Sequence, residues 1–401
     1  MGRLPLAKKI GLRLTIIVMM LVACEFAFRY GVWDKLAKPG SYAGTVVMIK
    51  NAVESLGPDK VDFLTIGDSI VGSGLNHQEV ATTAQKYGLT HVHVGTGGMH
   101  WMSTDFMIRW VKQQSPRLQN AVIATNVNNF RFAGNGEYEL AISAPIARPW
   151  NSERMLNSVE FKKENIRTYG VYSALFQYRD DIRDLVESPV KRVRDIRWTR
   201  RYAPNEKIIF DPIAVSRNIC RVPLASIQAC ADTKSPNPED INVVTQCRND
   251  APRAAKQAEQ KLDYRTWVDP TSWPHLNRLK PLRQQQLRDL PLKRPIMVVL
   301  MPVPKLTRES IQPIGIHEWT LSVLNPLVEE GTIELHDYTK LFDDGGESGG
   351  AGGPNGGIDC TAFHDLSHLN SVGQSRLTAK LLPILEDHLY RRAASGGNAT
   401  K

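Results

Sequence analysis

Cysteine is scarce in this sequence, and the motifs that mark zinc proteins or nucleic-acid-binding proteins are missing. The chain has five cysteines in 401 residues. None has the C-x-x-C spacing of a structural zinc site, so we expect no structural metal. The formal net charge is +9, yet no nucleic-acid-binding module accompanies it, and we expect no nucleic-acid partner. A composition of 42% hydrophobic and 23% charged residues is that of a globular protein and excludes a disordered chain.

The excess positive charge lies in arginine-rich segments in the middle of the chain. The clearest is VKRVRDIRWTRRY, residues 190–202. A basic surface of this kind can face an anionic partner, either a membrane or a glycan. A solvated basic helix face is an equally good interpretation of the same residues, and the sequence leaves both open.

The N-terminus has the charge order of an exported protein. Arg3, Lys8, Lys9 and Arg13 precede an uncharged apolar run that ends at Cys24. A helix over residues 10–28 would be about 28 Å long, near the thickness of the hydrocarbon layer. We therefore predict a single-pass anchor in the cell membrane, with the rest of the chain extracytoplasmic (periplasmic). A cleaved signal peptide is one alternative, and a lipoprotein whose lipidated first residue is Cys24 is another.

The remaining four cysteines are even in number, as expected in an oxidising compartment. Two disulfides are a reasonable prediction, and their three pairings cannot be separated from the sequence. If export were wrong, four unpaired thiols would be favoured. The four residues are Cys220, Cys230, Cys247 and Cys360.

Five short β-rich runs alternate with segments of helical periodicity. The runs are VDFLTI, THVHVG, NAVIATN, PIMVVLMPV and GTIELHDY, and amphipathic stretches separate most of them. This alternation predicts parallel strands with crossover helices, and hence an α/β fold: a three-layer α/β/α sandwich with a five-stranded parallel sheet. Residues 369–392 predict a long amphipathic helix that closes one face of the sheet.

The alternation stops between residues 132 and 293, a stretch too long for one crossover connection. We interpret it as an inserted, mostly helical subdomain. The predicted organisation is a cytoplasmic N-terminus with membrane segment (1–31), the first half of the α/β domain (32–131), the insertion (132–293), the second half (294–393) and a flexible tail (394–401).

Two short segments carry candidate chemistry. Gly67, Asp68 and Ser69 follow a predicted strand, where the first N–H groups of the next helix can bind a developing oxyanion. The same tripeptide is also typical of a turn or a helix cap. Near the C-terminus, Asp365 and His368 have a spacing that lets the carboxylate orient the imidazole toward a serine. A metal or capping role fits the Asp-x-x-His pair too, but the upstream serine favours a catalytic triad.

Together these segments resemble the SGNH (GDSL-type) hydrolase superfamily over residues 60–131 and 294–390. TIGDSIV resembles the first block, with Ser69 as nucleophile and oxyanion-hole donor. HVGTGGM resembles the second block, in which Gly98 would donate its N–H to the oxyanion hole. NVNNF resembles the third block, in which Asn128 would be a side-chain donor. DLSH resembles the last block, giving Asp365 and His368.

Three positions depart from the family blocks. His93 stands where the second block has asparagine, Asn126 replaces a glycine of the third block, and Asn129 replaces its terminal aspartate. Asn126 and Asn129 therefore compete with Asn128 for the donor role. A cluster of histidines (His77, His91, His93 and His100) lacks carboxylate or cysteine partners at ligand spacing, so we interpret them as core or site-rim residues. Trp101, Trp110 and Trp150 fit either a sugar platform or the core.

The resemblance implies a serine esterase or O-acyltransferase that needs no cofactor and no metal. Membrane-anchored members with a large insertion look like accessory proteins that act beside membrane-bound O-acyltransferases on exopolysaccharides or cell-wall polymers. We expect an acylated, and in particular acetylated, envelope glycan as substrate, a membrane-bound O-acyltransferase as partner, and membrane lipid around the N-terminal segment. A plain envelope carbohydrate esterase or lipase-type hydrolase and a non-catalytic glycan-binding protein on the same fold are the alternatives.

Overall fold

The computed structural model describes residues 6–131, 136–147, 170, 172–202, 274–304, 308, 315–343, 362–364 and 367–397. The chain divides into two compact units. The first consists of Met1–Ala52 and Ala133–Lys207, and the second of Val53–Phe132 and Ile208–Lys401. The segment predicted as an insertion, 132–293, contributes residues to both units.

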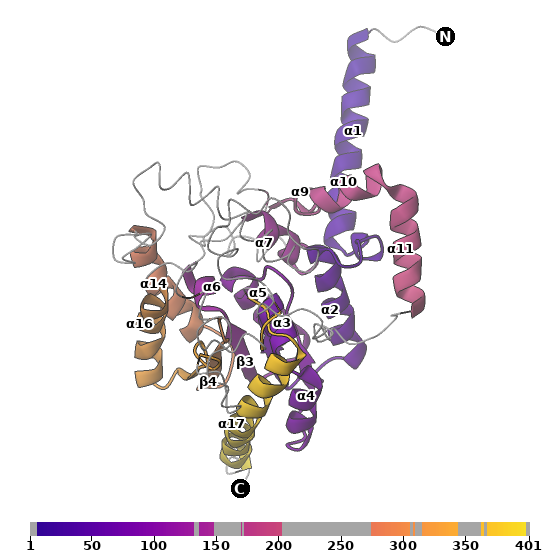
Figure 1. The fold of residues 1–401 in the computed structure, drawn as a ribbon. Coiled ribbons are helices and arrows are strands. Elements are labelled where there is room, and N and C mark those ends of the chain that lie inside the picture. The colour runs from indigo at the N-terminus through magenta and orange to yellow at the C-terminus, as the bar shows by residue number, and fades with distance from the viewer. Residues whose placement is uncertain are drawn as a thin grey trace, which may run out of the picture. The chain divides into compact units, whose positions relative to one another are not determined.

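A parallel β-sheet organises the second unit, and two of its strands, β3 and β4, are labelled in Figure 1. Its strands run in the order β2-β1-β3-β4-β5, and every neighbouring pair is parallel. The strands are β1 (Phe63–Ile66), β2 (His91–His93), β3 (Asn120–Thr125), β4 (Ile296–Leu300) and β5 (Ile333–Asp337). The α/β class and the five-stranded parallel sheet are thus confirmed, and the three-layer sandwich stays a prediction.

Burial explains why these particular runs form strands. Every residue of β1, β3 and β4 is buried, as expected for central parallel strands whose two faces are both covered. The edge strand β5 is only partly buried and carries Glu334, His336 and Asp337. Charged side chains on an edge strand discourage pairing with another chain.

The last helix, α17 (Ser371–Gly397), closes one face of the sheet as predicted. Its fully buried leucines recur every four residues, which places them on one stripe of the helix. They share a core with residues of β1, β3 and β4 and with α3 (Ser69–Gly74) and α4 (His77–Gln85). The leucines are Leu377, Leu381, Leu385 and Leu389.

Further helices pack together through side-chain to backbone hydrogen bonds. Thr320 of α16 (Ile316–Glu329) donates to the carbonyl of Val127 at 3.0 Å, at the start of α6 (Val127–Arg131). Arg283 of α14 (Pro274–Arg288) donates to the carbonyl of Phe130 in α6 at 3.3 Å. The helix α5 (Trp101–Gln114) connects β2 to β3.

The first unit is helical. It contains α1 (Leu6–Arg29), η1 (Trp33–Lys35), most of α2 (Tyr42–Leu56), α7 (Gly136–Ser143), α9 (Ala174–Gln177), α10 (Arg179–Glu187) and α11 (Pro189–Tyr202). Its small apolar core includes the aromatic side chains of Phe28, Trp33 and Tyr178, and the rings of Phe28 and Trp33 stack at 4.6 Å.

Helix α1 matches the predicted membrane segment. Within the described residues, Ile10–Arg29 is one helix long and apolar enough to cross a membrane, with a mean hydropathy of 2.0 and no burial of its apolar stretch. A signal sequence near an N-terminus has the same properties. The helix runs unbroken through Cys24, the one cysteine among the described residues, which is free and exposed. The other four cysteines lie outside the described residues, so their pairing stays a prediction.

Candidate active site

Ser69 begins helix α3 directly after a tight connection from β1. A Cβ atom on Gly67 would lie 2.4 Å from the carbonyl oxygen of Ala124 in β3 and 2.3 Å from Cγ2 of Val71, so the connection requires glycine. Asp68 is the N-cap of α3, and its Oδ1 accepts a hydrogen bond from the N–H of Ile70 at 2.9 Å. The turn-and-cap interpretation of Gly-Asp-Ser is therefore confirmed as a description of the backbone.

His368 lies in a loop whose two ends are tied together before α17. Phe363 and Leu369 form an antiparallel bridge, and the N–H of His364 donates to the carbonyl of His368 at 2.8 Å. Asn370 then caps α17, because its Oδ1 accepts hydrogen bonds from two N–H groups of the first turn. These bonds fix the backbone on both sides of the histidine.

The loop brings His368 to Ser69. The Ser69 Oγ lies 2.9 Å from Nε2 of His368, although the two residues are 299 positions apart in the sequence. Hydrogen-bond contact between a serine hydroxyl and an imidazole is the geometry in which the ring can take the serine proton. Asp365, the predicted third member of the triad, lies outside the described residues.

The three asparagines after β3 have different environments. The Oδ1 of Asn126 accepts from the N–H of Asn128 at 2.8 Å, so Asn126 stabilises the first turn of α6. Buried Asn129 donates from Nδ2 to Oδ2 of Asp68 at 2.9 Å. Asn128 is the half-buried member of the three. The two competitors for the donor role thus have structural hydrogen bonds, and Asn128 stays the predicted donor.

Sheet order places the candidate oxyanion donors at one edge. Gly98 has a φ of +68° and lies in the connection that follows β2, Ser69 follows β1, and Asn128 follows β3. These three strands are neighbours in the order β2-β1-β3. Because parallel strands end at the same edge of a sheet, all three residues lie at its carboxyl edge, where α/β proteins bind ligands.

Three of the clustered histidines surround a single threonine hydroxyl in the core. Oγ1 of Thr65, in β1, lies 3.3 Å from Nδ1 of His77, 3.0 Å from Nε2 of His91 and 3.2 Å from Nδ1 of His93. A hydroxyl has one proton to donate and two lone pairs that accept, so it can serve three neutral imidazoles at once. Their interpretation as core residues is confirmed for His77 and His93, which are buried.

Burial keeps these histidines neutral. It lowers the pKa of His77 to about 4. Burial, together with the neighbouring His77, lowers the pKa of His91 to about 3 and that of His93 well below its usual value. Burial also lowers the pKa of His100, against the opposing influence of Asp68 and Asn129.

The remaining candidates are core residues or lie outside the described part of the chain. Trp101 and Trp110 are buried, which excludes them as an exposed sugar platform, and Trp150 lies outside the described residues. In the residues that the structure describes, no group of three or more His, Cys, Asp or Glu side chains could hold a metal ion.

The sequence did not reveal the hydrogen bond between Asp68 and Asn129. This bond connects the segment after β1, next to Ser69, to the segment after β3. The one available signal was that each residue closely follows an apolar run, the first and the third along the chain. No protein-family model matches the chain, and no curated protein is similar to it in sequence.

Proposed function

We propose that the chain is a membrane-anchored, extracytoplasmic serine esterase or O-acyltransferase of SGNH type. It would act on acyl, in particular acetyl, esters of an envelope polysaccharide or cell-wall polymer. The observation that carries the proposal is the 2.9 Å contact between Ser69 Oγ and His368 Nε2. The three-layer sandwich and the anchoring role of α1 belong to the same proposal.

In the first half-reaction, His368 takes the proton of Ser69 as its Oγ attacks the acyl carbonyl. The negative charge that develops on the carbonyl oxygen is stabilised by the N–H groups of Ser69 and Gly98 and by the side-chain amide of Asn128. The imidazolium then donates its proton to the departing alkoxide, leaving an acyl ester on Ser69. Asp365 orients the His368 ring and stabilises its charged form.

In the second half-reaction, His368 takes a proton from the acceptor hydroxyl, which attacks the acyl ester. The tetrahedral intermediate collapses, and the imidazolium returns a proton to Ser69. Water as acceptor makes the protein an esterase, and a glycan hydroxyl makes it a transferase. The steps up to the acyl-enzyme are the same in both cases, so only the acceptor distinguishes an esterase from a transferase.

Covalent labelling tests the nucleophile. The purified full-length chain is treated with a serine-directed fluorophosphonate, and the labelled peptide is identified by mass spectrometry. We expect the label on Ser69, its loss in Ser69→Ala and its strong reduction in His368→Ala. Ser375, an exposed serine of α17, provides the control Ser375→Ala, which should label normally. A folded chain that leaves Ser69 unlabelled would favour the non-catalytic, glycan-binding alternative.

A second control separates a general histidine effect from the role of His368. His317 also pairs with a carboxylate, at 2.6 Å from Oδ2 of Asp337. Asp337 is the last residue of the edge strand β5, and β5 is three strand spacings, about 14 Å, from β1. His317→Ala should therefore label normally. Asn128→Ala should keep labelling but lose roughly 10²- to 10³-fold in turnover, the effect of one oxyanion donor.

Transfer and hydrolysis are distinguished by the acceptor. With a short-chain p-nitrophenyl ester as donor, an added oligosaccharide should increase turnover and become acylated if the chain is a transferase. Turnover that is independent of the oligosaccharide, with all acyl groups released as free acid, would identify the plain esterase.

A further inference from the structure

Helix α11 buries one arginine and exposes several large apolar side chains, which is unusual for a helix in water. Arg192 is 2% exposed, whereas Val190 is 83%, Trp198 is 65% and Val193 is 42% exposed. In the last turn of the helix before it, α10, Val186 is 74% exposed. A face with this composition requires a partner other than water.

The outward residues form one continuous face. At about 100° per residue, positions 190, 193, 194, 197 and 198 fall within an arc of about 140°, and positions 192 and 196 lie on the opposite side. Arg192 and Ile196 are the buried residues of the helix. The outward face therefore combines Val190, Val193 and Trp198 with Arg194 and Arg197.

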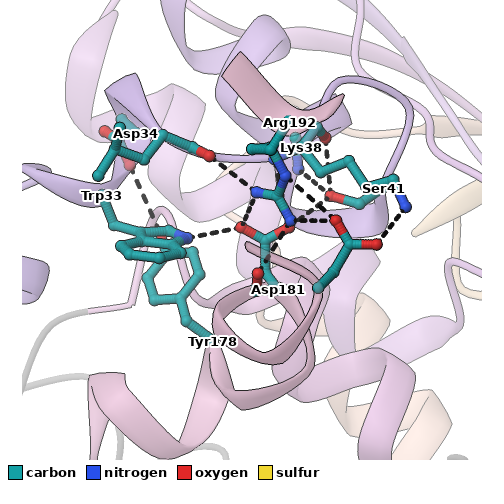
Figure 2. Close-up of polar contacts among 10 residues, drawn as sticks. Trp33, Asp34, Lys38, Ser41, Tyr178, Asp181 and Arg192 are labelled. Atoms are coloured by element: carbon teal, nitrogen blue, oxygen red, sulfur yellow. Dashed lines mark hydrogen bonds and ion pairs between the residues drawn. The ribbon is translucent and has the colours of Figure 1, made fainter. Parts of the chain in front are cut away.

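A buried ion-pair network fixes which face points outward (Figure 2). The guanidinium of Arg192 donates from Nη1 to Oδ2 of Asp181 at 3.0 Å and from Nη2 to Oδ2 of Asp184 at 2.7 Å. Asp181 also accepts a hydrogen bond from Nε1 of Trp33 at 2.6 Å. Because rotating α11 would separate a buried cation from both carboxylates, the helix cannot turn its apolar residues inward.

The same network attaches α11 to the segment that follows α1. Nη1 of Arg192 donates to the carbonyl of Leu36 at 2.8 Å, and Leu36 follows the last residue of α1, Arg29, by seven positions. Glu25 of α1 accepts hydrogen bonds from the N–H groups of Ala174 and Leu175 at the start of α9. Helices α9 to α11 are therefore tied to the C-terminal end of the apolar helix.

The charge of the outward face selects an anionic surface. Lys191, Arg194 and Arg197 are exposed. The nearby acids are Asp195, which lies 3.6 Å from Arg194, and exposed Glu187 beside Val186, so basic side chains are in excess. Arginine and lysine bind lipid phosphates, while valine and tryptophan side chains enter the boundary between headgroups and acyl chains. A glycan would satisfy the charges but offers no apolar phase for the valines.

We propose that the outward face of α11, together with Val186 at the α10–α11 corner, binds anionic phospholipid headgroups at the membrane surface where α1 ends. The inference rests on the proposed membrane insertion of α1, and this surface would be a contact additional to it. It would hold the first unit against the bilayer through a second contact, so that the unit does not swing freely on a single helix.

Site-specific photo-crosslinking tests the contact. The full-length chain is reconstituted in nanodiscs of phosphatidylcholine, alone or mixed with phosphatidylglycerol, with the photoreactive amino acid benzoylphenylalanine at Val190. Tyr390, an exposed aromatic residue of α17 (63% exposed), is the matched control position. We expect lipid adducts at position 190 in the anionic nanodiscs, detected by mass spectrometry, and few at position 390.

Charge reversal is the second part of the crosslinking test. The triple variant Lys191→Glu/Arg194→Glu/Arg197→Glu changes exposed side chains only and leaves Arg192 in place. It should reduce the lipid adducts at position 190 about tenfold, since each basic residue near an anionic surface contributes measurably to binding. Equal labelling in the two lipid mixtures, labelling no greater than at position 390, or crosslinks to protein in place of lipid would each overturn the proposal.

Discussion

The two units of this chain differ in the polar groups that cluster in their interiors. In the helical unit, buried Arg192 is paired with buried Asp181, and valines lie on the surface. In the sheet unit, histidines surround Thr65, and burial keeps them neutral.

This difference predicts that the two units respond differently to a change of pH. A buried ion pair is costly to form but tolerates a change of pH as long as both partners stay charged. Neutral buried histidines cost less at neutral pH but must be protonated when the protein is acidified. Acidification should therefore affect the sheet unit more than the helical unit, whose exposed apolar side chains are of the kind found at interaction surfaces.

The largest expected effect is a loss of kcat on substitution of two residues in the sheet unit. Ser69→Ala and His368→Ala should each lower kcat for a short-chain ester by at least about 10³-fold, because nucleophile and base act as one unit. The double variant should be no worse than either single variant. Additive losses in the double variant, measured by steady-state kinetics, would contradict a coupled pair.

Breaking the buried charge network should be the largest effect on stability. Arg192→Met leaves buried Asp181 without its cation and should cost about 3–5 kcal/mol, although Asp184 keeps its ion pair with Lys38. Denaturant unfolding in detergent, followed by limited proteolysis of α10 and α11, measures this loss. Arg194→Met removes an exposed pair with Asp195 and should cost less than about 1 kcal/mol. Similar losses in the two variants would mean that burial of Arg192 is unimportant.

Acidification should affect the sheet unit selectively. The folded pKa of His77 is about 4 against 6.5 for an unperturbed histidine, so the unfolded chain binds the proton more readily. Its contribution is fully present above pH 6.5 and decreases as the pH falls toward 4, reaching a loss of about 2 kcal/mol at pH 5. Unfolding measured at pH 7.5 and pH 5 tests this, and His77→Gln should show a smaller difference between the two. Equal stability of the native chain at both pH values would contradict it.

The smallest expected effect concerns the hydrogen bond from Asn129 to Asp68, the residue before Ser69. Asn129→Ala removes the donor to Asp68 and should lower kcat about tenfold, the effect of one buried hydrogen bond to a carboxylate. Since Asn129 positions the turn and does not touch the substrate in our proposal, KM should be unchanged. Asn129→Gln, which retains an amide, should recover part of the rate, whereas an equal loss in both variants would argue against the hydrogen bond.

Local patterns were sufficient to predict the sheet. All five strands coincide with apolar runs bounded by turn residues, and α17 follows a stripe of leucines at four-residue spacing. The contact of Ser69 with His368 was also predictable, because each lies in a short motif that resembles a block of the SGNH superfamily. Both features depend on residues close to one another in the sequence or on known chemical pairing.

Long-range polar contacts could not be predicted in this way. Arg192 lies in a segment whose charge suggested a solvated or anion-facing helix, and its burial depends on Asp181, eleven positions away, and on Leu36, which is 156 positions away. The bond between Asp68 and Asn129 spans 61 positions. No periodicity connects such residues, since a hydrogen bond between distant segments leaves no repeating signal in either.

The 299 positions between Ser69 and His368 also have a consequence for timing. Ribosomes add roughly 5–20 residues per second, so the proposed nucleophile is synthesised roughly 15–60 s before its proposed base. Throughout that interval Ser69 would be an ordinary alcohol, with no His368 imidazole to take its proton. If our proposal holds, a nascent chain has no esterase activity, and a fragment that stops before His368 never gains it.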